Sequence, residues 1–241
     1  MSKIKFSELK KFIINLDRRA DRLEHINEEM SWIGWDFERF SAIDTNSYIG
    51  CALSHQKLAE ICLDLDGEYF MFLEDDIFFM PYAKDQISKC EEDLNNIDFD
   101  FFHLAPSLHR PVNNLTNNLM DITNLPPKDV DRHREVFGTS GFIINKKTCE
   151  YILNWDTNKY IENSHRQLPI DEFLAKGVYP NIKAVASSLP IVTQTNNFSD
   201  IGNQFYNNHY TMTYNWNAYT QNKLPNNHMD FDYCKKLRDE N

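Results

Sequence analysis

Short apolar runs and helical stripes alternate along the first hundred residues of the chain. The runs predict β-strands, and the stripes, with apolar side chains three or four positions apart, predict α-helices. The predicted strands are 11–16, 36–43, the run that begins at Tyr69, and 99–104, and the predicted helices between them are 17–31, 50–63 and 81–96. This order favours an α/β fold with a mostly parallel, Rossmann-like sheet and helices on both faces.

The pattern is less regular after residue 104. Residues 106–133 combine prolines with many Asn and Asp residues and have no sustained period, which predicts an irregular insertion. Further strands are predicted at 136–145, 178–186 and 190–195, and further helices at 146–155 and from Pro169 onwards. After about residue 200 the chain is rich in Asn and Tyr, and we expect a C-terminal tail that wraps over the functional site. Residues 1–241 are therefore expected to form a single domain.

Three consecutive carboxylates, Glu74, Asp75 and Asp76, follow the apolar run that begins at Tyr69. Adjacent carboxylates repel one another, so holding them together at a strand end favours a hard divalent cation. On an extended backbone Glu74 and Asp76 share one face while Asp75 points the other way, so at most two of the three are expected to reach one ion. A solvated acidic turn is the alternative for the triplet taken alone.

Two polar motifs lie at other predicted strand and helix ends. Arg18, Arg19 and Arg22 follow the first strand at a predicted helix N-terminus, where guanidinium groups and helix amides favour phosphate oxygens. Arginines paired with nearby acids on a solvated helix are the alternative. In the segment Gly50-Cys-Ala-Leu-Ser54-His55, the two polar side chains can bind a ribose or sugar hydroxyl, or serve as a capping Ser and a structural His.

Composition and charge exclude several classes of protein. A net charge of −11 argues against general nucleic-acid binding, because phosphate backbones are held mainly by clustered Lys and Arg. The five cysteines are odd in number and widely spaced, so neither a disulfide framework nor a zinc knuckle is predicted. No signal peptide or integral membrane segment is found, and a cytoplasmic location is the expectation. The short basic stretch 235–238 is followed at once by two acids, which leaves only peripheral membrane contact open.

Taken in order, these motifs give the chain a family resemblance over roughly residues 11–201. The motifs are Ile14-Asn15-Leu16-Asp17-Arg18-Arg19 with Asp21-Arg22, Ala42-Ile43-Asp44, Gly50-Cys51-Ala52-Leu53-Ser54-His55, Leu73-Glu74-Asp75-Asp76, Pro169-Ile170-Asp171 and Ser199-Asp200-Ile201. In these residues the chain resembles glycosyltransferase family 25, which includes lipooligosaccharide galactosyltransferases and collagen hydroxylysine galactosyltransferases. The resemblance implies a GT-A fold, a nucleotide-sugar donor such as a UDP-hexose, a Mn²⁺ or Mg²⁺ ion, and inversion at the anomeric carbon.

The resemblance also implies a set of site residues. Asp76 is the first choice for direct metal coordination, Asp75 is a metal ligand or an acceptor of ribose hydroxyls, and Glu74 is expected to orient its neighbours. The residues expected to bind the donor are Asn15, Leu16, Arg18, Arg22, Asp44, Ser54, His55, Glu74 and Asp75. The third metal ligand is not assigned, although His209 and Asp200 lie in the C-terminal region where a closing residue is expected.

Inversion requires a base that takes the proton of the acceptor hydroxyl on the face opposite the leaving diphosphate. Asp171 is the candidate base, because its position matches the later acidic motif of the family, and Glu172 is the fallback. An acid that only stabilises a helix N-terminus is the structural alternative for Asp171. Ser140 and Gly141 are candidate substrate contacts, since glycine lets a backbone approach a sugar closely, although a tight bend in a core strand explains them equally well.

The resulting prediction is a metal-dependent inverting glycosyltransferase that moves galactose or glucose from a UDP-sugar to a hydroxyl of a glycan, glycolipid or hydroxylysine-type acceptor. A non-catalytic module that binds nucleotide sugars or glycans is the alternative, and the presence of both the acidic triplet and Asp171 argues against it. A metal-dependent phosphohydrolase is a further alternative, which leaves the motifs at 15–22 and 50–55 without a role. The sequence identifies neither the sugar, nor the acceptor, nor the oligomeric state.

Overall fold

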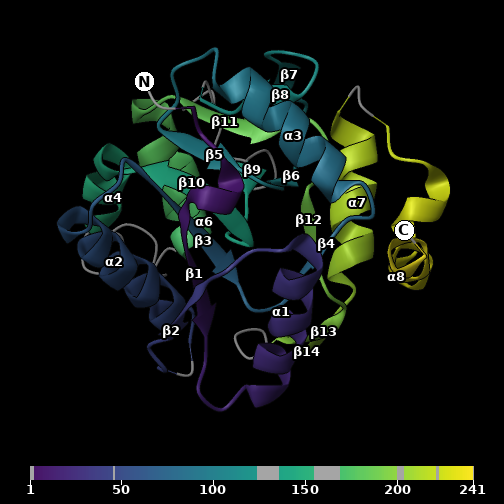
Figure 1. Cartoon of the computed structure of the whole chain (residues 1–241), viewed down its shortest axis with the longest axis horizontal. Helices are drawn as coiled ribbons and strands as arrows, with labels where there is room; N and C mark the ends of the chain where they lie inside the picture. The colour runs from purple at the N-terminus through teal and green to yellow at the C-terminus, as the bar shows by residue number, and fades with distance from the viewer. Residues whose placement is uncertain are drawn as a thin grey trace.

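An eight-stranded sheet with helices on both faces forms the centre of the protein (Figure 1). The computed structural model describes residues 3–45, 47–123, 136–154, 169–199, 204–220 and 223–240. In sheet order the strands are β2 (Glu38–Ser41), β1 (Lys10–Asn15), β3 (Tyr69–Glu74), β10 (Gly141–Asn145), β5 (Phe101–His103), β11 (Ala184–Ser187), β8 (Leu119–Asp121) and β7 (Asn113–Asn114). Only β10 and β8 of this sheet run against the common direction.

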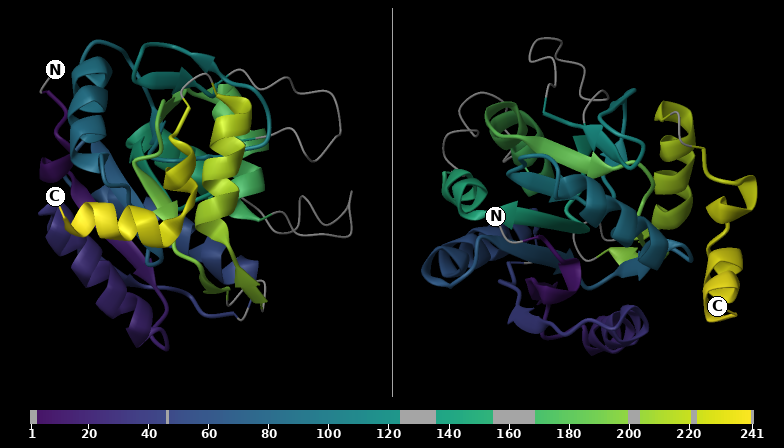
Figure 2. Two further views of the ribbon diagram at one scale, coloured as in Figure 1. Left: turned by 90° about the vertical axis from the view of Figure 1, so that its right-hand side faces the viewer. Right: turned by 45° about the horizontal axis from the view of Figure 1, so that its top comes forward.

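The helices form two layers. Helices α1 (Ala20–Ile33) and α3 (Ala83–Leu94) cover one face of the sheet, and α2 (Tyr48–Asp64), α4 (Lys146–Leu153) and α6 (Ile170–Phe173) cover the other (Figures 1 and 2). Helix α2 packs against both α4 and α6. The predicted α/β class, with a mostly parallel sheet between two helical layers, is confirmed.

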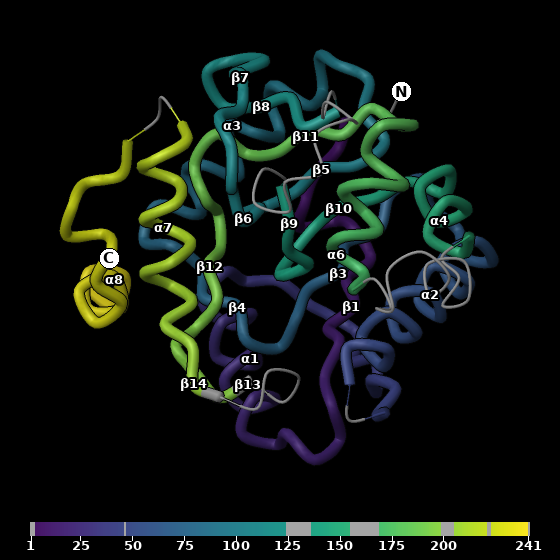
Figure 3. The backbone as a smooth tube through the Cα atoms, turned by 180° about the vertical axis from the view of Figure 1, so that it is seen from behind, coloured from purple at the N-terminus to yellow at the C-terminus, as the bar shows by residue number. Residues whose placement is uncertain are grey.

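Shorter elements complete the described part of the chain. Three small antiparallel pairs are β4 (Ile77–Phe79) with β12 (Val192–Gln194), β6 (Ser107–Leu108) with β9 (Val136–Phe137), and β13 (Asn197–Ser199) with β14 (Gln204–Tyr206). Helices α7 (Asn208–Tyr219) and α8 (Phe231–Asp239) lie together along one side of the molecule (Figure 3). Single helical turns occupy Phe6–Glu8, Leu174–Val178, Tyr179–Asn181 and Asn226–Met229.

The first half of the chain follows the predicted order of elements, and the second half departs from it in four places. The predicted strand at 136–145 is interrupted, because Gly138 has a φ of 104°. Residues 174–181 are helical, so the strand predicted at 178–186 begins only at Ala184. The insertion at 106–133 contains three short strands, and its residues 124–135 lie outside the described residues. The expected tail contains two helices, α7 and α8.

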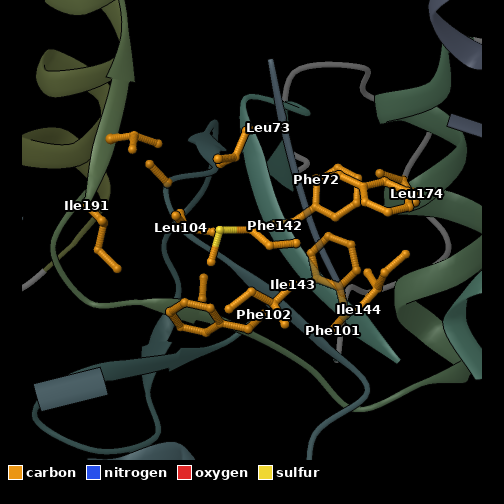
Figure 4. Close-up of a cluster of buried hydrophobic side chains, with 14 of the residues drawn as sticks. Phe72, Leu73, Phe101, Phe102, Leu104, Phe142, Ile143, Ile144, Leu174 and Ile191 are labelled. Carbon is orange, nitrogen blue, oxygen red and sulfur yellow. The ribbon is translucent and has the colours of Figure 1, made fainter. Parts of the chain in front are cut away.

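Aromatic side chains from the central strands form much of the core (Figure 4). The rings of Phe101 and Phe142 stack at a centroid separation of 5.0 Å, and Phe72 packs against Phe142 at 5.5 Å. His55 of helix α2 stacks on the Phe142 ring of the sheet, at a centroid separation of 5.7 Å. Burial lowers the pKa of His55 to about 4, so the imidazole is neutral in the folded protein at neutral pH.

Helix α8 is held to the body of the protein by a buried ion pair. Arg238 Nη1 lies 2.5 and 2.6 Å from the two carboxylate oxygens of Glu29 on α1, and both side chains are buried. Glu29 also accepts a hydrogen bond of 2.9 Å from the backbone N–H of Phe79 in β4. The guanidinium lies over the Phe78 ring at 4.4 Å. The C-terminal helix is therefore connected directly to the strand that follows the acidic triplet.

None of the described helices is both long and apolar enough to cross a lipid bilayer. The five cysteines are free thiols, in agreement with the prediction from their spacing. Four of them are buried, and Cys51 is partly exposed.

Replacing Arg238 by Ala tests the role of the buried ion pair. The substitution leaves the Glu29 carboxylate buried without its partner, and we expect the free energy of unfolding to fall by about 3–5 kcal/mol. The matched control is Lys236→Ala on the same helix, because Lys236 and Glu240 form an exposed pair at 3.8 Å that contributes less than about 0.5 kcal/mol. Urea denaturation measures the free energy of unfolding of each variant. Equal decreases in the two variants would contradict the stabilising role of the Arg238–Glu29 pair.

The buried imidazole of His55 predicts a pH-dependent loss of stability. The pKa of histidine is about 6.5 in an unfolded chain and about 4 for His55 in the folded protein. Between these values the unfolded state binds more protons, so stability falls as the pH falls from 6.5 towards 4. Urea denaturation at pH 7 and pH 5 should show that His55→Leu loses about 2 kcal/mol less than the wild type between the two pH values. An identical loss would show that His55 does not titrate in this way.

Candidate functional site

A cavity of about 590 Å³ lies at the carboxyl ends of β1 and β3, where ligands bind in open α/β sheets. Its volume is typical of small-molecule sites. The candidate residues from the sequence that line it are Leu16, Arg18, Arg22, Asp44, Glu74, Asp75, Asp76, Asp171 and Glu172. The fold therefore brings residues from four separate motifs to one cavity.

Arg22 and Asn15 hold the two aspartates of the triplet. Arg22 Nη1 lies 2.9 Å from an oxygen of Asp75 and 3.2 Å from an oxygen of Asp76, so both carboxylates converge on one nitrogen. The amide of Asn15 donates to the other oxygen of Asp75 at 2.6 Å. The alternation expected for an extended backbone does not separate these two carboxylates, because β3 ends at Glu74 and the chain turns at Asp75 and Asp76.

Glu74 is held from the other side of the cavity. Thr139 Oγ1 donates to one carboxylate oxygen of Glu74 at 2.5 Å, and Gln194 Nε2 donates to the other at 2.9 Å. Gln194 also reaches Asp76 at 3.3 Å, so a single amide bridges two members of the triplet. Burial, and next the charge of Asp76, raise the pKa of Glu74 to about 8. Burial likewise raises the pKa of Asp75.

The acidic triplet has the charge and the ligand type that a hard divalent cation requires. Two of the three carboxylates contact one guanidinium, and burial, followed by the charge of Asp76, raises the pKa values of Glu74 and Asp75. Among the described residues, no group of three or more His, Cys, Asp or Glu side chains is arranged to hold a metal ion. The triplet can supply one or two carboxylates to an ion that takes its other ligands from water and substrate phosphates, as Mg²⁺ commonly does.

Arg22 also connects the triplet to the β13–β14 hairpin. Its Nη2 donates to the side-chain oxygen of Asn197 at 2.9 Å and to the backbone oxygen of Phe198 at 3.0 Å. Asn197 and Tyr206, which pair across this hairpin, both line the cavity. Part of the predicted tail thus contributes to the cavity wall.

The far side of the cavity is formed by residues that follow β1 and β2. Arg18 and Asp44 form an ion pair there, and both line the cavity. The apolar side chains of Leu16 and Ile43 lie on the same wall. Gly50 is required for this arrangement, because a Cβ at this position would lie 2.2 Å from the backbone oxygen of Ile43.

Asp171 lies in α6 and lines the cavity from an element separate from the triplet. One of its carboxylate oxygens accepts a hydrogen bond of 2.8 Å from the backbone N–H of Glu172. Burial raises the pKa of Asp171 above its usual range, which makes the carboxylate a better proton acceptor when it is ionised. Glu172 also lines the cavity, although its carboxylate is paired with Lys176 at 2.8 Å.

Ser54 and His55 were also predicted to bind the donor, and neither is among the residues that line the cavity. Helix α2 leads away from the cavity, and only its first turn, with Tyr48 and Cys51, reaches the wall. Ser54 is buried and bridges the backbone N–H of Ile43 and the backbone oxygen of Gly50, at 2.8 and 2.7 Å. His55 is enclosed by core aromatic rings.

Three other predicted contacts, Asn15, Ser140 and Gly141, do not line the cavity either. Asn15 is buried behind the cavity wall, where it positions Asp75. Gly138 and Thr139 line the cavity, whereas Ser140 and Gly141 do not, because the strand has already turned into the core. A Cβ on Gly141 would lie 2.8 Å from the Leu73 side chain, so close strand packing accounts for this glycine.

The two residues considered as a third metal ligand have different outcomes. Both ring nitrogens of His209 are engaged, with Thr193 Oγ1 at 2.8 Å and the backbone oxygen of His228 at 2.9 Å. His209 is therefore a structural residue. Asp200 lies outside the described residues.

Sequence reasoning missed Gln194 and Asn197, and it did not assign a role to Thr139. Gln194 ends β12, and the rule that ligands bind at strand ends could have indicated it. Asn197 carries no comparable signal, because its place depends on a hairpin formed far along the chain. Thr139 directly precedes Ser140, which was a candidate substrate contact.

Comparisons with known proteins identify the family. The model of glycosyltransferase family 25, described as an LPS biosynthesis protein, matches residues 8–48 and 44–174, which is more than half of the chain. A glycosyltransferase 25 family member from Aedes aegypti is 28% identical over 115 residues, covering 36% of this chain and 19% of that protein. A protein from Haemophilus influenzae named as a glycosyltransferase is 24% identical over 195 residues, covering 68% of this chain and 63% of that protein.

Among solved structures, a glycosyltransferase involved in the glycosylation of the major capsid of PBCV-1 is similar over 74% of this chain and 80% of that chain, with a TM-score of 0.45 and 14% identity. The family match includes the arginine motif, the acidic triplet and Asp171. The chain belongs to glycosyltransferase family 25.

Proposed function

We propose that the protein transfers a hexose, galactose or glucose, from a UDP-sugar to a hydroxyl group of a glycan, glycolipid or hydroxylysine-type acceptor, with inversion and with the help of Mn²⁺ or Mg²⁺. The convergence of Glu74, Asp75, Asp76 and Arg22 at one end of a cavity that also contains Asp171 carries this proposal. Membership of the family supports the class of reaction.

In this proposal the donor extends across the cavity. Arg22, beside the triplet, and Arg18, beside Asp44, supply the positive charge that a diphosphate requires. The apolar wall formed by Leu16 and Ile43 provides a surface for a flat base. Asn15, Thr139 and Gln194 fix the carboxylates of the triplet so that their oxygens need not reorganise when the donor binds.

Asp76 and Asp75 are the residues that would hold the ion, and a dication there supplies stabilisation of the negative charge that develops on the leaving diphosphate. Glu74 supports them through its bonds to Thr139 and to Gln194, which also contacts Asp76. Asp171 accepts the proton of the acceptor hydroxyl. It lines the cavity from α6, an element separate from the one that carries the triplet. Its partial burial favours this proton transfer.

Two alternatives are less well supported. A phosphohydrolase needs the acidic triplet, and it gives no role to Arg18 and Asp44, which line the same cavity. A binding module without catalysis gives no role to Asp171, whose carboxylate is kept in the same cavity as the triplet.

Replacing Asp76 by Asn tests the metal and donor site. We expect the affinity for UDP in the presence of Mn²⁺, measured by isothermal titration calorimetry, to fall by more than about 100-fold, because a direct ion ligand is lost. Chelation of the ion by EDTA should weaken binding by the wild type in the same way. The matched control is Asp85→Asn, an exposed acid paired with Lys89, which should bind UDP as the wild type does. Undiminished, metal-dependent binding by Asp76→Asn would place the ion elsewhere.

Replacing Asp171 by Asn separates catalysis from donor binding. Hexose transfer, followed by mass spectrometry with a panel of UDP-hexoses and simple acceptors, should fall by about 10²–10⁴-fold, because the base is lost. UDP affinity should stay within about twofold of the wild type. The neighbouring Glu172→Gln variant is the comparison, and a larger loss of transfer in that variant would assign the base to Glu172. Absence of transfer and of donor hydrolysis by the wild type with every UDP-hexose would refute the proposed function.

A further inference from the structure

Exposed aromatic side chains are concentrated in one stretch of the chain. Five of the large apolar side chains that are exposed among the described residues belong to the β13–β14 hairpin and the start of α7, and we call them the aromatic edge: Phe198, Phe205, Tyr206, Tyr210 and Tyr214. Phe205 is 79% exposed and Tyr214 is 54% exposed. Folding usually buries such rings, so their exposure in one region indicates a binding surface.

The aromatic edge is continuous with the cavity. Tyr206 lines the cavity, and the adjacent Phe205 packs edge-on against Phe198 across the hairpin at 5.6 Å. Asn207 caps α7 immediately afterwards, and Tyr210 and Tyr214, one helical turn apart, stack with nearly parallel rings at 5.9 Å. Because Arg22 donates to the backbone oxygen of Phe198, the hairpin is also fixed to the acidic triplet.

Core packing does not account for the exposed rings. Helix α7 packs on the protein through its opposite side, where His209, Met212, Thr213 and Trp216 are buried. Tyr210 and Tyr214 face the solvent from the same helix. Removing them leaves the buried contacts of α7 in place.

The chemistry of this stretch suits a neutral saccharide. Residues 204–220 contain no Asp, Glu, Lys or Arg, although a quarter of the whole chain is charged. Apart from aromatic residues, the stretch consists mainly of Asn and Thr. The C–H face of a pyranose ring packs against an aromatic ring, and its hydroxyl rim exchanges hydrogen bonds with amides and hydroxyls. The lack of basic residues disfavours nucleic acids and anionic membrane surfaces as partners.

We propose that the aromatic edge binds the acceptor of the transfer reaction, and that this acceptor is a neutral oligosaccharide whose terminal sugar enters the cavity past Tyr206. The proposal rests on the proposed function, because only a transferase needs a second saccharide next to its donor. Phe205, Tyr210 and Tyr214 hold the sugars outside the cavity, and the terminal hydroxyl is delivered to the side of Tyr206 that faces the cavity.

Direct binding to an array of defined neutral oligosaccharides, with fluorescently labelled full-length protein, tests the proposal. We expect the wild type to bind a set of hexose-containing oligosaccharides, and Phe205→Ala and the double variant Tyr210→Ala/Tyr214→Ala to weaken that binding about tenfold or more. Tyr233→Ala, which removes an exposed ring on α8, is the matched control and should bind as the wild type does. Circular dichroism should show unchanged folding of all variants.

The same variants separate this proposal from the proposed function. UDP affinity with Mn²⁺ should be unchanged in Phe205→Ala and Tyr210→Ala/Tyr214→Ala. Absence of UDP binding by the wild type would count against the proposed function and its donor site, and not against oligosaccharide binding by the aromatic edge. Absence of oligosaccharide binding by the wild type, or equal binding by the variants, would overturn the acceptor assignment. So would a dimer in analytical ultracentrifugation that the variants dissociate, or binding to neutral phosphatidylcholine vesicles that the variants abolish, because either result would assign the aromatic edge to another partner.

Discussion

Mutual repulsion among the carboxylates at the end of β3 is the constraint on which the site depends. Glu74, Asp75 and Asp76 are brought into a partly buried corner, and burial, followed by the charge of Asp76, raises the pKa of Glu74 to about 8. Arg22, Asn15, Thr139 and Gln194 offset this repulsion with hydrogen bonds and one positive charge. The corner remains rich in negative charge, which is the condition under which a cation and a diphosphate bind together.

The groups that stabilise this corner come from the whole length of the chain. Asn15 and Arg22 precede the triplet by more than fifty residues, and Gln194 follows it by about 120. Strand β4 begins directly after Asp76, pairs with the strand that carries Gln194, and contacts Glu29, which in turn binds Arg238 of the last helix. The C-terminal region thus completes and braces the site, and Arg22 connects the acidic triplet to the hairpin that carries the aromatic edge.

The sequence predicted the α/β class, the order of the first four main strands, and the residues that stand directly at strand ends. Asp44 and Asp76 closely follow the ends of β2 and β3, and Arg22 lies in the first turn of α1, so local geometry places all three at the cavity. Ser54 and His55 do not line the cavity, because they lie on α2 beyond its first turn and the direction of that helix decides which of its residues reach the wall. The rule that ligands bind at strand ends could have indicated Gln194, which ends β12. Asn197 and the exposed face of α7 could not be predicted, since their positions depend on contacts between distant segments.

In the proposed function, the acidic triplet holds a divalent ion against the diphosphate of a UDP-sugar. A crystal structure of the protein with UDP and Mn²⁺, with anomalous scattering measured at the manganese edge, tests it most directly. We expect an anomalous peak at about 2.1 Å from a carboxylate oxygen of Asp76, in contact with diphosphate oxygens that Arg22 also reaches. A manganese peak remote from the triplet, or a diphosphate bound outside this cavity, would contradict it.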